Sequence, residues 1–147
     1  MRRWVLLLVG FVPLWSSPAA AQVIVHTVAI TTNSSGDVTV YTPSTFGLVR
    51  ALRYVPDGTS PLDNGADLTI TDNVTGHGIL TVTDIGPSAR DWHPRVYTVS
   101  TTGVNAVYAA AGESVMTEVA IGAAIKIVVA QGGNAKSGTL YVYVQGR

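Results

Sequence analysis

IKIVVAQ, residues 125–131, and TLYVYVQ, residues 139–145, are the two stretches that decide the fold. Both are rich in β-branched and aromatic side chains, which pack well on a pleated strand and lose rotamer freedom in a helix. Between them lies GGNAKSG, residues 132–138, a run of residues that favour turns. Two strong strand signals around such a loop predict a β-hairpin at the C-terminal end of the chain.

Similar short runs fill the sequence between residue 22 and this hairpin. We expect further strands at residues 23–31, 37–42, 47–55, 68–71, 79–83 and 115–121. The turn cluster at 33–36 predicts a hairpin between the first two of these strands, and the loop at 72–78 predicts another between residues 68–71 and 79–83. Residues 89–97 are expected to form a loop that crosses between sheets. A short helical turn fits only at residues 104–111.

The number and spacing of these runs predict an all-β chain. About seven or eight strands favour a single antiparallel β-sandwich or open barrel, with one domain over residues 22–147. The 147 residues include 22 valines and 17 threonines, a composition that agrees with β-structure. No run of ten or more residues keeps the 3.6-residue period of an amphipathic helix, so we exclude a helical bundle.

The charge and cysteine counts exclude several classes of function. Only 12% of the residues are charged, and nine basic residues balance nine acidic ones. A basic face for binding nucleic acid cannot be built from so few cations. The absence of cysteine excludes disulfide frameworks, thiolate zinc sites, iron–sulfur ligation and cysteine nucleophiles.

Residues 1–21 have the order of a secretory signal peptide. Arg2 and Arg3 precede an apolar run of about 12 residues, which is short of the ~20 that a membrane-spanning helix needs. Small residues follow, and we expect cleavage after Ala21; a downstream start or an unprocessed segment is the alternative. The mature chain then carries seven basic and nine acidic residues, a net charge near −2, and no membrane span.

No catalytic or cofactor motif is found in the sequence. The three histidines are His26, His77 and His93, and none has a second histidine three to five positions away. His26 is expected to be a half-buried strand residue and His77 a solvated loop residue. A Gly-x-Ser-x-Gly elbow, a P-loop and a dinucleotide-binding glycine pattern are all missing. We therefore expect no enzymatic activity, no cofactor and no metal.

The densest cluster of polar and aromatic residues is a candidate partner-contact loop, made up of Arg90, Asp91, Trp92, His93 and Arg95. Tryptophan and arginine are enriched at the centres of protein interfaces, so Trp92 could anchor a partner. In the alternative interpretation, Trp92 closes one end of the sandwich while Arg90, Asp91 and Arg95 pair with one another at the surface.

Four aspartates form a second candidate, a weak cation-binding loop: Asp57, Asp63, Asp67 and Asp72. Carboxylate oxygens are the ligands that calcium prefers, but the spacing does not match an EF-hand. The alternative is that these residues, together with Asn64, serve the turns in which they lie.

Several motifs resemble those of a known group of proteins. RYVPDGT at residues 53–59, NGADLTIT at 64–71 and the stretch at 125–139 resemble sequences of small β-rich structural proteins, head-associated or decoration-like, from tailed bacteriophages and prophages. The resemblance extends over residues 30–144. It implies a non-enzymatic virion component that contacts other copies of itself and a capsid protein.

The N-terminal segment departs from that group, because a virion protein assembled in the cytoplasm needs no export signal. The alternative function is an exported bacterial surface or periplasmic β-sandwich binding module. Such a module would hold its ligand through the aspartate loop or the Trp92 loop.

Overall fold

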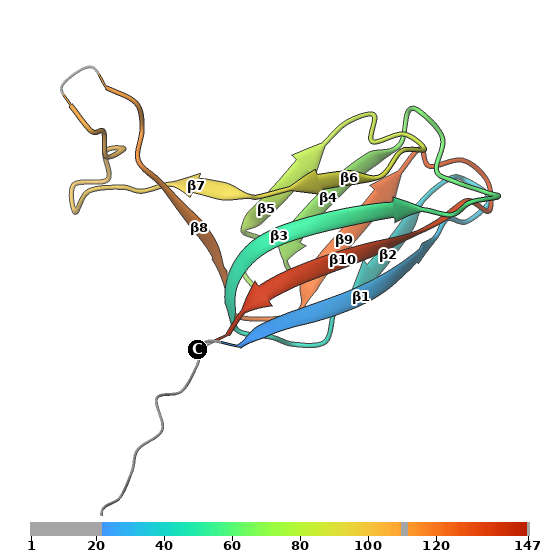
Figure 1. Ribbon diagram of the computed structural model, residues 1–147, viewed down its shortest axis with the longest axis horizontal. Coiled ribbons are helices and arrows are strands. Elements are labelled where there is room, and N and C mark those ends of the chain that lie inside the picture. The colour runs from blue at the N-terminus through green and yellow to red at the C-terminus, as the bar shows by residue number, and fades with distance from the viewer. Residues whose placement is uncertain (1–21, 110–111, 147) are drawn as a thin grey trace, which may run out of the picture.

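A computed structural model describes residues 22–109 and 112–146. The expected signal segment at residues 1–21 lies outside this range. The described residues form ten strands in antiparallel sheets, which confirms the all-β class (Figure 1). The strands are β1 (Val23–Thr31), β2 (Val38–Tyr41), β3 (Gly47–Pro56), β4 (Asp67–Asp72), β5 (Gly78–Val82), β6 (Arg90–Trp92), β7 (Arg95–Tyr97), β8 (Met116–Ile121), β9 (Ile125–Ala130) and β10 (Ser137–Gln145).

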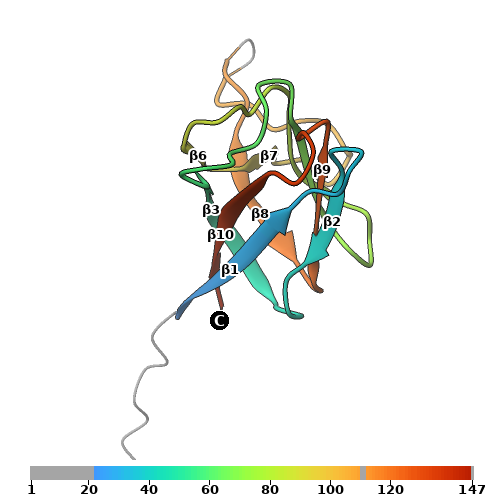
Figure 2. The same cartoon turned by 90° about the vertical axis from the view of Figure 1, so that its right-hand side faces the viewer.

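The strands are arranged in two layers. One sheet has six strands in the order β1-β10-β3-β8-β7, with β6 also paired to β3. The other sheet has four strands in the order β2-β9-β4-β5. Seen end-on, β2 and β9 lie across the sandwich from β1, β10 and β3 (Figure 2).

The core lies between the layers and is built by alternation along the strands. On β9 the inward residues Ile125, Ile127 and Val129 are fully buried, and their neighbours are only partly buried. In the opposite sheet, Leu140, Val142 and Val144 of β10 are likewise fully buried, with partly buried residues between them. These two sets belong to a single hydrophobic cluster. The stretches that signal β-structure most strongly are therefore inner strands, one in each sheet.

The expected C-terminal hairpin is wrong, although both of its strands exist. β9 pairs with β2 and β4, whereas β10 pairs with β1 and β3. The connection between them crosses from one sheet to the other. Within it, Gln131, Gly133 and Ala135 all adopt positive φ, which bends the backbone sharply. Turn-forming residues therefore build an arch between layers here, in place of a turn within one sheet.

The expected hairpin of the first two strands is wrong for the same reason. β1 pairs with β10 and β2 pairs with β9, so residues 32–37 form a second arch. The two arches are hydrogen-bonded to each other. Gly132 N–H donates to Gly36 O at 2.8 Å, and Thr32 N–H donates to Lys136 O at 2.9 Å. These bonds satisfy backbone groups that would otherwise need water.

The structure confirms some of the remaining expectations and corrects others. The hairpin of β4 and β5 is confirmed, as are the strands expected at residues 47–55 and 115–121. Residues 104–111, the one place where the sequence allows a short helical turn, form no helix where the structure describes them, because Asn105 and Val107 form β-bridges with Val99 and Ser114. Residues 89–97 are not simply a crossing loop: they contain β6 and β7, and the chain changes sheet earlier, between β5 and β6.

Close packing inside the larger sheet depends on one glycine. Tyr54 of β3 is completely buried, and its ring lies against the backbone of Gly138 on β10. A Cβ atom at position 138 would lie 2.9 Å from the Tyr54 hydroxyl oxygen and closer still to the ring. The aromatic ring therefore occupies the space that a side chain on β10 would need.

We predict that Gly138→Ala lowers the free energy of unfolding by about 1–3 kcal/mol, because the added methyl group would overlap the buried Tyr54 ring and overpack the core. Gly78→Ala is the matched control, since Gly78 is also a strand glycine but a Cβ atom added there would meet nothing within 4 Å beyond its chain neighbours. Urea unfolding of both variants measures the difference. Equal stability of the two would contradict the packing described here.

Candidate interaction site

β7 and β8 form an arm that leaves the sandwich (Figure 1). The two strands pair antiparallel, from Arg95 opposite Glu118 to Tyr97 opposite Met116. The ladder continues outward, with Thr98 N–H donating to Val115 O at 2.9 Å. Further along, Ala106 N–H donates to Thr98 O and Val115 N–H to Ala106 O. The arm therefore holds its shape through its own backbone hydrogen bonds.

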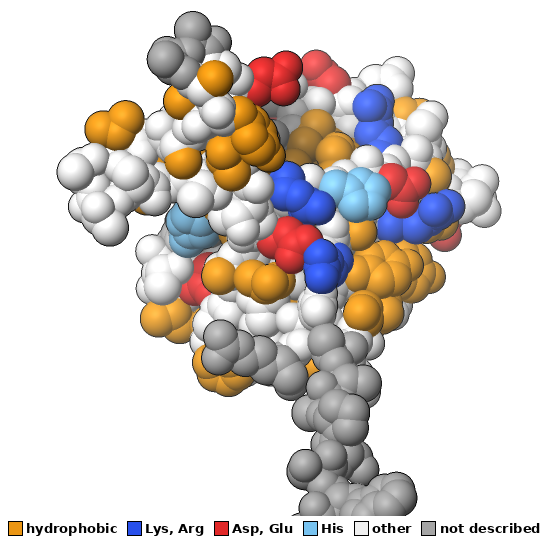
Figure 3. Space-filling model, turned by 60° about the vertical axis from the view of Figure 1, so that its left-hand side comes forward, with side chains coloured by type: hydrophobic (Ala, Val, Ile, Leu, Met, Phe, Trp, Pro, Cys, Tyr) orange, Lys and Arg blue, Asp and Glu red, His pale blue; other side chains and the backbone are white. Residues whose placement is uncertain are grey.

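The arm exposes large apolar side chains. Six of them are between 46% and 78% exposed: Tyr97, Val99, Val104, Val107, Tyr108 and Met116. The sequence from 96 to 117 contains one charged residue, Glu113. The space-filling view shows hydrophobic side chains gathered on the projecting arm, at upper left in Figure 3. A concentration of exposed apolar residues with so little charge is typical of a protein-binding surface.

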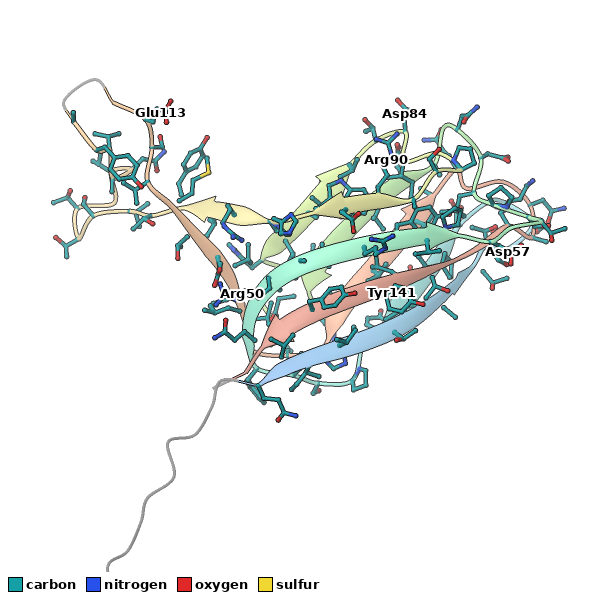
Figure 4. The ribbon with its side chains drawn as sticks, in the orientation of Figure 1. Arg50, Asp57, Asp84, Arg90, Glu113 and Tyr141 are labelled. Carbon is teal, nitrogen blue, oxygen red and sulfur yellow. The ribbon has the colours of Figure 1, made fainter. Side chains whose placement is uncertain are left out.

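The arm is attached to the sandwich at its root, which we define as the buried apolar residues of β7 and β8 together with the ion pairs around Glu118. Val119 and Ile121 of β8 belong to the core, and Val96 of β7 packs against it. The pairing of β3 with β10 shifts by one residue beside Arg50, as in a β-bulge. Arg50 bonds to both Glu118 of the arm and Gln145 of β10. Figure 4 shows Arg50 near this root and Glu113 on the outer part of the arm.

Glu118 is the centre of this root. Its side chain is 15% exposed, and it pairs with Arg50 and, at 3.7 Å, with Arg95. Two cations around one partly buried carboxylate join β3, β7 and β8. Because part of the cluster is shielded from water, salt screens it less than it would an exposed pair.

The predicted partner-contact loop is divided between two places. Arg90 and Asp91 belong to β6, where Arg90 donates to Ile85 O at 2.8 Å and Asp91 lies 3.4 Å from Arg53 of β3. Trp92 is partly buried and packs against the core. His93 is exposed and precedes β7, which begins at Arg95. The expectation that Arg90, Asp91 and Arg95 pair with one another is wrong, because each bonds elsewhere.

The four aspartates of the predicted cation loop also have separate roles. The backbone N–H groups of Ser60 and Thr59 bind Asp57 and lower the pKa of its carboxyl. Asp63 lies 3.5 Å from Lys136, and Asp67 accepts a hydrogen bond from the Gln131 side chain at 3.2 Å. The described ranges 22–109 and 112–146 contain no group of three or more acidic or histidine side chains that could hold a metal ion.

Asp72 is buried and links the two layers. One carboxylate oxygen accepts hydrogen bonds from Val74 N–H, Thr75 N–H and the Thr75 hydroxyl, at 2.9 to 3.0 Å. The other accepts from Gly122 N–H at 3.1 Å, in the connection between β8 and β9. The N–H of Thr75, and after it that of Gly122, lowers the pKa of Asp72 to about 2. Its carboxylate is therefore a structural anchor.

Two shallow hollows lie on the sandwich itself. One, of 410 Å³, is lined by Asn33, Asp37 and residues of β2 and β9. The other, of 320 Å³, lies beside Asp57 and Gly58 where β1, β3 and β10 meet. Their linings are mainly threonine, serine, valine and alanine, without a base placed next to a nucleophile.

Among the described residues, no helix is long and apolar enough to cross a membrane.

Comparison with known proteins yields little. No family model matches the sequence, and no curated protein matches it either. One solved structure is similar, a crystal structure of FLHE, with a TM-score of 0.41 and 9% sequence identity; the match covers 86% of this chain and 100% of that one.

Sequence patterns did not indicate the arm. Valines and tyrosines at irregular spacing are ordinarily assigned to the core or to loops, and their spacing does not predict that they are exposed. The one available signal was the low charge between Arg95 and Glu118.

We predict that Glu118→Ala lowers the free energy of unfolding by about 1 kcal/mol, because Arg50 and Arg95 lose their shared partner. The loss should be larger at low ionic strength than at high. Glu113→Ala changes the other carboxylate of the arm and should leave stability unchanged. Urea unfolding at two salt concentrations gives both values; identical results for the two variants would contradict a role for Glu118 in the root.

We predict that the stabilising effect of Asp72 is pH-dependent. Because the pKa is lower in the folded state, the contribution is complete above about pH 4 and disappears as the pH falls toward about 2. Asp72→Asn should therefore be less stable than the wild type at neutral pH, with the difference shrinking on acidification. Asp91→Asn, which alters an exposed ion pair, is the control. Thermal melts across this pH range test the prediction, and parallel curves for wild type and Asp72→Asn would refute it.

Proposed function

We propose that this protein is a non-enzymatic structural subunit that attaches to an apolar protein surface of a larger assembly through its β7–β8 arm. The observation that supports this proposal is the arm itself. It projects from a well-packed sandwich, carries six exposed large apolar side chains and has a single charged residue, Glu113, between residues 96 and 117.

The chemistry of the arm favours a protein partner. Tyrosine and methionine are enriched at the centres of protein interfaces, where charged residues are depleted. A partner bound through phosphate groups would require cations, and between Arg95 and Glu118 the arm has none. The hydrogen bonds along the arm and the Glu118 root order it before it binds, which reduces the entropy lost on association.

The resemblance to bacteriophage structural proteins suggests the kind of assembly. In that setting the arm would insert between capsid proteins or contact neighbouring subunits, while the sandwich stays on the surface of the particle. A head-associated or decoration subunit needs this division, because its folded body must be stable before it attaches.

We predict that shortening the arm abolishes attachment and leaves the sandwich intact. Replacing residues 99–114 with an Asn-Gly turn would close the ladder beyond Thr98 and Val115 with a hairpin that suits such strands. A milder variant, Tyr97→Ser with Tyr108→Ser, should weaken binding about tenfold or more.

The measurement is sedimentation of the tagged full chain with phage-type particles induced in its source strain. Wild type should move with the particles, and the shortened variant should remain in the free-protein fraction with an unchanged unfolding midpoint. Thr81→Ser, an exposed change on β5, is the control. Equal sedimentation of the shortened variant, or no association of the wild type, would overturn the proposal.

A further inference from the structure

β1 is an edge strand with unusual properties. It is nine residues long and, among the described strands, pairs only with β10. Its sequence, VIVHTVAIT, contains no lysine, arginine, acidic residue or proline. The other described strands with a single partner are shorter, with four residues in β2, five in β5 and three each in β6 and β7.

The pairing with β10 determines which backbone groups of β1 are free. Thr32 N–H donates to Lys136 O, and at the other end Gly146 N–H donates to Gln22 O. In an antiparallel ladder, hydrogen-bonded and non-hydrogen-bonded positions alternate. The even-numbered residues therefore bond to β10, and the N–H and C=O groups of Val23, Val25 and Thr27 point away from it, along the open edge.

The first half of the strand is open to solvent. Val23, Ile24 and Val25 are 53%, 37% and 47% exposed, whereas Val28 and Ile30 are 7% and 1% exposed. In Figures 1 and 2 the beginning of β1 extends away from β2, and the later part of the strand runs alongside it. The accessible edge is therefore residues 23–27.

Soluble proteins normally protect such an edge with charges, prolines, bulges or short strands. β5 is short and has a bulge-like irregularity at Ile79, where its register with β4 shifts between Ile70 and Thr71, and β2 is short and follows Asp37. β1 has none of these protections. An uncharged edge without these protections, whose outward backbone groups have no strand partner among the described residues, is suited to receive another extended strand.

We infer that two copies of this chain pair through β1, antiparallel and about a two-fold axis. Among the described edges, only a second β1 offers a matching length of β-branched residues. Pairing centred on Val25 places Val23 opposite Thr27 and Ile24 opposite His26 of the partner copy. No like charges meet in this arrangement, and β-branched cross-strand pairs are favourable.

The pairing would join two six-stranded sheets into one sheet of twelve strands. Two-fold contacts are closed, so both open edges are consumed and no further copy can add at this site. The contact uses neither the arm nor the Glu118 root, so it is independent of the proposed attachment.

Single cysteines test the geometry cleanly because the chain has none of its own. We compare Val23→Cys, Val25→Cys and Thr27→Cys under mild oxidation on a non-reducing gel. Facing residues of a hydrogen-bonded pair lie ~5.5 Å apart at Cα, within reach of a disulfide. The disulfide-linked dimer should be most abundant for Val25→Cys, and mixing Val23→Cys with Thr27→Cys should restore a cross-link. Thr81→Cys on β5 is the control and should not cross-link.

Sedimentation equilibrium of the unmodified chain supplies the second measurement. Wild type should be dimeric, and Val25→Lys should raise the dimer dissociation constant at least about tenfold without changing the unfolding midpoint of the monomer. The variant with residues 99–114 replaced should remain dimeric. A monomeric wild type at ~100 µM, cross-linking equal to that of Thr81→Cys, or a dimer lost with the arm would overturn this inference. A Val25→Lys monomer that still sediments with particles would leave the proposed function in place.

Discussion

The single hydrophobic cluster that β9 and β10 build from opposite sheets is the constraint on which the rest of the structure depends. Ile125, Ile127 and Val129 of β9 and Leu140, Val142 and Val144 of β10 are all fully buried and belong to this one cluster. Each of the two strands is also an inner strand with a neighbour on both sides, so fixing β10 fixes β1 and β3, and fixing β9 fixes β2 and β4, through their ladders. The hydrogen-bonded arches at residues 32–37 and 131–136 then hold the layers in register.

The sequence predicts strands well in this protein and predicts their partners poorly. Alternation along residues 125–131 and 139–145 reports that one face is buried, which is a local property. Whether the loop between them folds back within a sheet or crosses to the other sheet depends on which strands fill the remaining ladders. Glycine and asparagine favour a turn and an arch equally. For this reason the β4–β5 hairpin is confirmed while the hairpins expected at the two ends of the chain are wrong.

The candidate sites show a related division. The aspartates and the Arg90–Trp92 segment stand out in the sequence because they are polar or aromatic, and the structure places most of them in turns, ion pairs or the margin of the core. The arm passes unnoticed because Val99, Val104 and Tyr108 resemble core residues by type. The type of a hydrophobic residue does not predict whether its side chain is buried or exposed. The path of the backbone shows that these side chains lie away from the core.

The separation of the arm from the core has a consequence for how this protein can change. The described residues at 98–109 and 112–115 lie outside the hydrophobic cluster that stabilises the sandwich, and within the described part of the chain the root joins the arm to it. Surface substitutions away from the core and its hydrogen-bond networks usually change the free energy of unfolding by less than about 0.5 kcal/mol, so exposed side chains at the tip can be exchanged with little effect on folding. The surface that the tip presents and the stability of the fold therefore depend on different residues of the same small chain, and each can evolve without the other.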